Sequence, residues 1–164
     1  MKGTIKHFFE YLMLYLTKAK FMSASTLEIL KSFEGQAMDK SPSPFGRWLK
    51  GVLLKVDKGE VTCSFEVRDE MCNPLGLLHG GVAASIADEV IGIAGATLDL
   101  PGRYVSINLT TDFMDSAKSG DLIHATATID RAGKTLIHGT CKISHPERQK
   151  VLAFSTSNLV ALRT

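Results

Sequence analysis

The sequence predicts an α+β fold in which a curved, mostly antiparallel sheet wraps around one long helix. Two strand-like segments come first, and an apolar run rich in Ala, Ile and Val follows them. Four more strand-like segments complete the chain, with connections short enough for hairpins. A sheet with one principal helix buries the apolar side of that helix by curling around it.

Length and composition favour one globular domain with an appendage. The chain has 164 residues, of which 45% are hydrophobic and 22% charged. We expect an N-terminal helical extension and linker over residues 1–44 and the main domain over residues 45–164. A net charge of +2 without a basic patch argues against nucleic acid. Three cysteines without a C-x-x-C motif favour a reducing compartment, so we expect a cytoplasmic protein.

The apolar segment "IKHFFEYLMLYLTKAKFM" needs its own interpretation. Charged residues interrupt it, and its uninterrupted run from Tyr11 to Thr17 is too short to cross a bilayer. We favour a helix that packs on the body or on a partner subunit. Two alternatives stay open: the segment contacts a membrane surface, or translation starts at Met22.

A second helix is expected to begin at Ser25. Glu28 stands three residues later, which is the capping-box pattern, and Leu30 and Met38 mark the apolar side. The following "DKSPSPFG", residues 39–46, contains two prolines that forbid a continued helix. We interpret this stretch as the linker to the main domain.

The main domain should open with a hairpin. "WLKGVLLKV" is interpreted as a strand, "DKG" as a turn, and "EVTCSFEV" as a strand with alternating apolar residues. The long helix is expected from about Gly80 to Leu98. The four later strands are expected at Arg103–Phe113, Asp121–Asp130, Thr135–Ser144 and Val151–Leu162.

The later connections contain residues fit for tight turns, namely Ser116–Gly120, "RAGK" and "HPERQ". In the strand from Arg103 to Phe113, strict alternation predicts two faces. One face would carry Val105, Ile107, Leu109, Thr111 and Phe113, and the other Ser106, Asn108, Thr110 and Asp112.

The start of the long helix has the properties of a carbonyl-binding site. The segment "NPLGLLHGGVAASIADEV" opens the helix with His79, Gly80 and Gly81. A helix N-terminus offers unpaired amides and partial positive charge, and glycines allow a ligand atom to come close. His79 could bind a neighbouring loop or a substrate carbonyl. The alternative is a loop in which the glycines serve only a tight turn.

Asp88, nine residues after His79, is the second candidate feature. Its neighbours Ala87 and Val90 are apolar, so we interpret it as a carboxylate in an apolar cleft, acting as general base or nucleophile. An exposed acid pair with Glu89 is the alternative.

The spacing of the two features predicts a site shared between subunits. Asp88 lies about 12 Å along the helix from its start, so one carbonyl cannot contact both. Two copies packed antiparallel across a twofold axis would place each helix N-terminus beside the partner's Asp88. We therefore expect at least a homodimer.

No cofactor or metal is expected. His138 and His145 lack ligand partners at useful spacing, and "GKT" lacks the earlier glycine of a phosphate loop. Cys72 as a nucleophile is the less favoured alternative to a small half-buried filler.

The segment "NPLGLLHGGVAASIAD" resembles the signature of hotdog-fold acyl-CoA thioesterases of the phenylacetate-pathway, or PaaI-like, type. The resemblance runs from about Phe45 to the C-terminus. It includes "VSINL" in the next strand, then F-M-x-x-A-K-x-G-D and "RAGKTL".

The resemblance implies a hotdog fold, homodimers that often pair into homotetramers, and metal-independent hydrolysis of acyl-CoA. Asp88 would be general base or nucleophile, and the Gly80 amide of the other subunit would polarise the thioester carbonyl. Asn73 and His79 would orient substrate or water, and Ser106 would help to hold the water. CoA contacts would come from Arg131, Ala132, Gly133, Lys134, Thr135, Leu136, Phe113 and Lys118, with Asn108 in the pocket.

Two other functions stay open: a non-catalytic hotdog module that binds acyl-CoA or lipid, and a hotdog dehydratase or hydratase. The acyl group is also open, because aryl, medium-chain and long-chain thioesters all fit the pattern.

Overall fold

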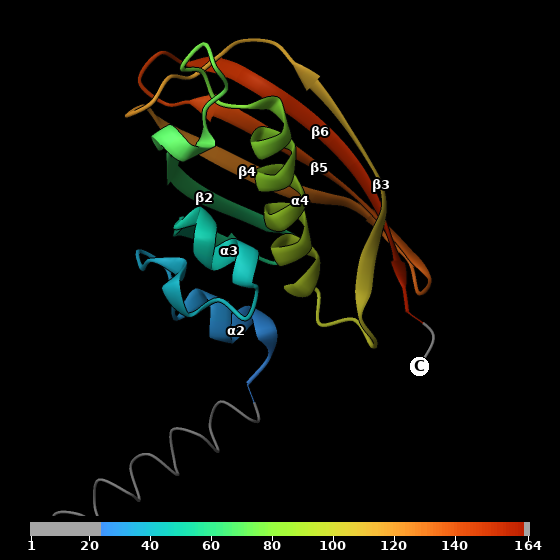
Figure 1. The fold of residues 1–164 in the computed structure, drawn as a ribbon. Helices are drawn as coiled ribbons and strands as arrows, with labels where there is room; N and C mark the ends of the chain where they lie inside the picture. The colour runs from blue at the N-terminus through green and yellow to red at the C-terminus, as the bar shows by residue number, and fades with distance from the viewer. Residues whose placement is uncertain (1–23, 163–164) are drawn as a thin grey trace, which may run out of the picture.

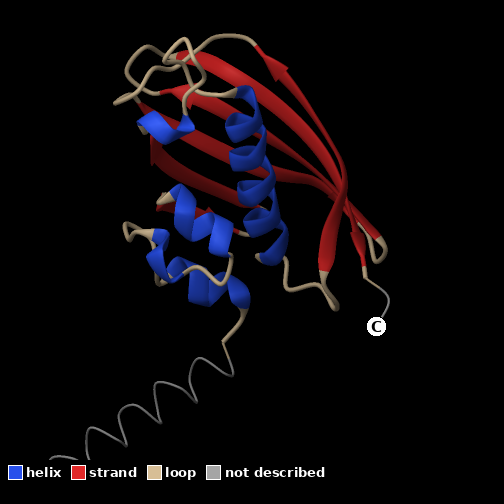
Figure 2. Cartoon of the chain, viewed as in Figure 1, coloured by secondary structure: helices blue, strands red, loops and turns tan. Residues whose placement is uncertain are grey.

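The computed structural model describes residues 24–162 and has the architecture that the sequence predicts (Figures 1 and 2). A six-stranded antiparallel sheet curves around the helix α4, and short helices lie beside α4 (Figure 1). The expectations for the segment before Met22 fall outside the described residues. None of the helices within residues 24–162 is long and apolar enough to cross a membrane.

The strand order across the sheet is β1-β2-β4-β5-β6-β3, and every neighbouring pair is antiparallel. The strands are β1 (Val52–Asp57), β2 (Glu60–Glu66), β3 (Tyr104–Phe113), β4 (Leu122–Ala132), β5 (Leu136–His145) and β6 (Lys150–Ala161). The helices are α2 (Thr26–Lys31), η1 (Met38–Lys40), α3 (Pro44–Leu49), η2 (Asp69–Met71) and α4 (Gly80–Ala96).

The core lies between α4 and the concave face of the sheet. Helix α4 ends at Ala96, two residues before the predicted end. Its sheet-facing side is buried throughout and consists of Ala83, Ile86, Ala87, Val90, Ile91 and Ala94. The alternation predicted for β2 is confirmed, since Val61, Cys63 and Phe65 are at most 1% exposed. Burial raises the pKa of the Cys63 thiol to about 12.

The predicted strand over residues 48–56 is wrong at its start. Helix α3 occupies Pro44–Leu49, and β1 begins only at Val52. The cause is local, because Pro44 stands at the first helical position, where its missing N–H costs nothing. The Ser43 hydroxyl caps this helix by accepting the Gly46 N–H at 3.0 Å.

The hairpin expected across Ser116–Gly120 does not form, although a tight turn is present there. The Asp121 N–H donates to the Lys118 carbonyl at 3.0 Å, and Gly120 has φ +85°. Strand β3 pairs with β6 at the edge of the sheet, while β4 lies between β2 and β5. The connection therefore passes from one part of the sheet to another. It is anchored on the way, because Ala117 is buried and its carbonyl accepts the Leu78 N–H at 2.8 Å.

Strand β3 departs from strict alternation at a bulge between Ser106 and Asn108. Ser106 pairs with Leu159, which is 3% exposed, and Leu109 pairs with the fully buried Ser157. Ser106 and Leu109 therefore share the face toward α4, and the prediction that they lie on opposite faces is wrong. A bulge inserts one extra residue and so shifts the alternation by one.

Helix α2 is attached to the main body at both ends. Ser25 and Glu28 form the predicted capping box, but the helix ends at Lys31 and does not reach Met38. The Thr26 N–H donates to Asp99 Oδ1 at 2.7 Å, just beyond the end of α4. The Gly35 N–H donates to the Leu53 carbonyl of β1 at 2.7 Å. These bonds fix α2 against the C-terminal half of α4.

Candidate active site

The N-terminus of α4 keeps an open backbone donor. His79 is the N-cap residue, and its Nδ1 accepts the Gly81 N–H at 2.9 Å. The next two amides, of Val82 and Ala83, donate to the His79 carbonyl at 2.9 and 3.0 Å. Within residues 24–162 no acceptor takes the Gly80 N–H, as expected for the first residue of a helix. The helix therefore presents one free amide to an incoming oxygen.

His79 also presents a donor. A neutral imidazole whose Nδ1 accepts a hydrogen bond carries its proton on Nε2. The residue is exposed, so this Nε2–H can reach a ligand beside the helix start.

Asn73 organises the loop that leads into α4. Its Oδ1 accepts the backbone N–H groups of Leu75 at 2.9 Å and Leu77 at 3.2 Å. Its own N–H donates to the Leu77 carbonyl at 2.8 Å. Gly76, at φ +72°, supplies the left-handed turn that closes the loop. The side-chain oxygen of Asn73 thus serves the loop, and its Nδ2 makes no hydrogen bond within residues 24–162.

Asp88 lies at the middle of α4 and is joined to β3. The Ser106 hydroxyl donates to Asp88 Oδ1 at 2.6 Å, a bond across 18 residues of sequence. The β3 bulge makes this contact possible, because it turns Ser106 toward the helix. Asp88 Oδ2 accepts no hydrogen bond within residues 24–162, so it can bind a water or substrate atom.

Glu89 occupies a different environment from Asp88. Its Oε2 accepts the Ser43 hydroxyl at 3.1 Å, and its side chain packs beside Gly46 of α3. Burial raises the pKa of the Glu89 carboxyl above its ordinary value, despite the Ser43 bond. The two acids are not an exposed pair, since both are half-buried and they face different elements.

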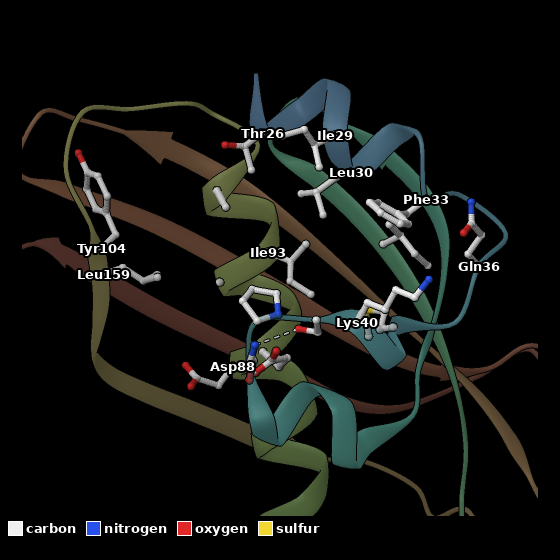
Figure 3. A pocket seen from close by; sticks show the side chains of 18 of the residues that line it. Thr26, Ile29, Leu30, Phe33, Gln36, Lys40, Asp88, Ile93, Tyr104 and Leu159 are labelled. Atoms are coloured by element: carbon white, nitrogen blue, oxygen red, sulfur yellow. Dashed lines mark hydrogen bonds between the residues drawn. The ribbon is translucent and has the colours of Figure 1, made fainter. Parts of the chain in front are cut away.

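Two cavities meet at Asp88 and Ser106. The larger one, of about 750 Å³, lies between α4, α2 and β3 (Figure 3). The smaller one, of about 540 Å³, lies between α4 and β3 and includes Phe45 and Asn108. The Asn108 carboxamide oxygen accepts both the backbone and side-chain N–H groups of Asn158, at 2.9 and 3.0 Å. A substrate could therefore approach Asp88 from either side.

The residues expected to contact CoA fall into two groups at opposite ends of α4. Phe113 and Lys118 lie at the helix start. The Phe113 ring is so close to Gly80 that a Cβ added to this glycine would lie 3.1 Å from it. Lys118 pairs with Leu77 in an isolated antiparallel β-bridge. The second group lies at the exposed β4–β5 turn, near the helix C-terminus, and comprises Arg131, Ala132, Gly133, Lys134, Thr135 and Leu136. The Tyr104 hydroxyl donates to the Lys134 carbonyl of that turn at 3.1 Å.

A single chain therefore brings together only part of the expected set. Asn73, His79 and Gly80 share the helix start, and Asp88 and Ser106 share its middle. Within the described part of the chain, no three His, Cys, Asp or Glu side chains gather as metal ligands.

The sequence did not predict the residues of α2 and α4 that line the larger cavity. Gly92 and Ala96, four and eight residues after Asp88, form a small-residue face that could have indicated open space beside the helix.

Comparison with known proteins identifies the class. The family described as the thioesterase superfamily matches residues 75–152. Human acyl-coenzyme A thioesterase 13 is 31% identical over 133 residues, which span 80% of this chain and 91% of the human one. The crystal structure of thioesterase superfamily member 2 from Mus musculus superposes with a TM-score of 0.70 at 26% identity. It covers 82% of this chain and 96% of the mouse one.

The E. coli PaaI protein from the phenylacetic acid degradation operon shares the fold. Its TM-score is 0.70 at 22% identity, over 76% of this chain and 88% of the bacterial one. The chain belongs to the thioesterase superfamily, among the hotdog-fold thioesterases of PaaI-like type, and it is a thioester hydrolase.

Proposed function

We propose that the chain hydrolyses acyl-CoA thioesters to a free acid and CoA, without a metal ion, in a site shared by two copies. The observation that carries this proposal is the 2.6 Å bond from Ser106 Oγ to Asp88 Oδ1. It orients a half-buried carboxylate where two cavities meet and leaves its second oxygen open. A general base requires this combination of fixed position and accessible oxygen.

In the proposed reaction a water attacks the thioester carbonyl while Asp88 Oδ2 accepts its proton. The carbonyl oxygen becomes an oxyanion, which the Gly80 N–H of the second copy stabilises. The tetrahedral intermediate then collapses, the C–S bond breaks, and the CoA sulfur leaves with the proton. In the alternative route an Asp88 oxygen attacks the carbonyl carbon, the C–S bond breaks, and CoA leaves as a thiolate that takes a proton from water. Water then hydrolyses the resulting anhydride to the free acid and the Asp88 carboxylate. Asn73 Nδ2 and His79 Nε2–H orient the thioester in both routes.

The distances along α4 support the shared site. Gly80 and Asp88 are about 12 Å apart along one helix, so one carbonyl needs the amide from another copy. The outer edge of β3 can join two copies, because β3 and the residue after it carry exposed apolar side chains. Val105, Ile107, Phe113 and Met114 are 40%, 59%, 59% and 59% exposed. We propose a homodimer, and a homotetramer formed from two such dimers.

The same antiparallel arrangement accounts for the two groups of CoA residues. It places the β4–β5 turn of one copy, residues 131–136, near the helix start of the other. Arg131 and Lys134 would then approach Lys118 of the other copy, which concentrates positive charge where CoA phosphates bind.

The test compares two neighbouring acids by thiol release from acyl-CoA. Asp88→Asn keeps size and polarity but removes the base, so turnover should fall about a hundredfold to ten-thousandfold. Glu89→Gln is the matched control, because Glu89 binds Ser43 rather than Ser106, and its turnover should drop only modestly. Wild-type turnover in Asp88→Asn, or abolished turnover in Glu89→Gln, contradicts the assignment of the base.

A further inference from the structure

We propose that Asn158 of β6 is a positioning residue, which holds Ser106 opposite Asp88 by fixing the bulge in β3. It acts together with Asn108 of β3 and His138 of β5, and we call these three residues the bulge clamp. The inference rests on the proposed function and deepens it, because it names what holds the hydroxyl that binds the base.

The bulge decides which way Ser106 points. Ser106 pairs with Leu159 and Asn108 pairs with Asn158, so one residue of β3 between them has no partner in the ladder. Neighbouring strand residues face opposite sides of a sheet, and a shift of one residue reverses every side chain. Without the bulge, Ser106 would stand opposite Val160 rather than Leu159. Its hydroxyl would then lie on the convex face, away from α4.

The hydrogen bonds of the bulge clamp allow one assignment of donors. The backbone N–H of Asn158 lies 2.9 Å from the Asn108 carboxamide, so the atom that accepts it is Oδ1. The same oxygen lies 3.0 Å from the Asn158 carboxamide, which must therefore present Nδ2. Asn158 Oδ1 is left to accept, and His138 Nδ1, 3.0 Å away, carries the proton. The clamp thus joins β3, β6 and β5, which lie side by side (Figure 1).

A further bond holds the backbone of Asn108. The Ser157 hydroxyl, which is fully buried, donates to the Asn108 carbonyl at 2.8 Å. A buried polar group that loses its partner is costly, so this bond resists a shift of Asn108 along β6. The residue that ends the bulge is therefore fixed to β6 through both its carbonyl and its side chain.

Asn158 can be changed without altering the space that a substrate would enter. Among the described residues that line the two cavities at Asp88, neither Ser157 nor Asn158 occurs. Asn108 does line the smaller cavity, so a change of Asn108 could also affect substrate contacts. A change of Asn158 reaches Asp88 through β3, and Asn158 is therefore the residue to vary.

The experiment compares the kinetics of Asn158→Val and Thr156→Val in the full-length protein. Valine favours strands and deletes the carboxamide that joins Asn108 to His138. Thr156→Val is the matched control, because Thr156 lies on the same face of β6, two residues before Asn158. A displacement of about 1 Å can lower a rate about a hundredfold, so Asn158→Val should lower kcat about tenfold to a hundredfold. KM should change little in Asn158→Val, and Thr156→Val should keep the wild-type kcat.

A double-mutant cycle separates positioning from a general effect on the sheet. Ser106→Ala removes the hydroxyl that the bulge clamp positions, so adding Asn158→Val should lower kcat no further. A loss of equal size with and without Ser106 overturns the inference, and so does equal kcat in Asn158→Val and Thr156→Val. If circular dichroism or light scattering shows that Asn158→Val does not fold or assemble, Ser157→Ala replaces it. This variant deletes one hydroxyl, and an unchanged kcat in it overturns the clamp.

Crystal structures of the two valine variants separate the inference from the proposed function. In Asn158→Val, Ser106 Oγ should lie beyond hydrogen-bond distance of Asp88 Oδ1, whereas Thr156→Val should keep the separation of 2.6 Å. A separation that stays at 2.6 Å in Asn158→Val overturns the bulge clamp. If Ser106→Ala keeps the wild-type kcat, the proposed function loses the Asp88–Ser106 pair, while a displaced hydroxyl in the crystal still supports the clamp.

Discussion

The free amide of Gly80 can be removed by one substitution. Proline lacks a backbone N–H and is well suited to the first position of a helix, which Gly80 occupies. The residue before a proline must be extended, and His79 already is, at φ −65° and ψ 132°. Gly80→Pro should therefore preserve α4 and delete the proposed oxyanion donor.

Gly80→Ala is the matched control. Both variants place a Cβ 3.1 Å from the Phe113 ring, which is exposed and can shift, but only alanine keeps the N–H. Loss of one oxyanion donor typically lowers kcat by about a hundredfold to a thousandfold. We expect Gly80→Pro to fall below Gly80→Ala by that factor.

The assay is the initial rate of thiol release at saturating acyl-CoA, with circular dichroism and light scattering to verify folding and assembly. Comparing kcat rather than KM isolates the donor, because an oxyanion contact forms mainly in the transition state. Equal kcat for the folded proline and alanine variants would refute the role of the Gly80 amide.

Two further predictions concern assembly and stability. Mixing and refolding Asp88→Asn with Gly80→Pro should restore about a quarter of wild-type turnover. About half of the dimers are then mixed, and one of the two sites in each mixed dimer is intact. If mass spectrometry verifies the heterodimers but turnover does not recover on mixing, the site is not shared. Asp99→Gly keeps the left-handed backbone of Asp99, at φ +50°, but removes the acceptor of the Thr26 N–H. It should lower the free energy of unfolding by about 1 kcal/mol at pH 7 in urea titrations, the typical net contribution of one hydrogen bond. Hydrogen bonds from Thr26 hold the pKa of the Asp99 carboxyl below its ordinary value, so this contribution is present above about pH 4 and is lost as the pH falls further. A stability difference between the two proteins that persists unchanged at pH 2 would show that Asp99 does not act through its charge.

The elements whose signals are local could be predicted from the sequence. Helix α4 starts at Gly80 as predicted, because His79 and two glycines mark the start of an apolar run. The alternation of β2 identified its buried face, and the Ser25 capping box marked the start of α2. Each of these signals lies within a few residues of the element that it specifies.

Features that depend on distant pairing could not be predicted. A proline that ends one helix can start another, so the sequence around Pro44 did not distinguish a linker from α3. The bulge at Ser106 depends on pairing with β6, about 50 residues later, and alternation alone assigned Ser106 to the wrong face. The spacing of Asp88 and Ser106 came from a resemblance, and only the bulge explains how the two side chains meet.

The position of β3 has a consequence for synthesis of the protein. Within residues 24–162 the sheet partner of β3 is β6, which follows the other five strands in the sequence and is therefore synthesised after them. The first four strands in the order β1-β2-β4-β5 can assemble earlier, since their partners are already made. Ser106 acquires its fixed position opposite Asp88 only when residues 150–161 are available. The Asp88–Ser106 pair of the proposed site can therefore form only after residues 150–161 have been synthesised, and a premature stop before them would leave β3 without its sheet partner.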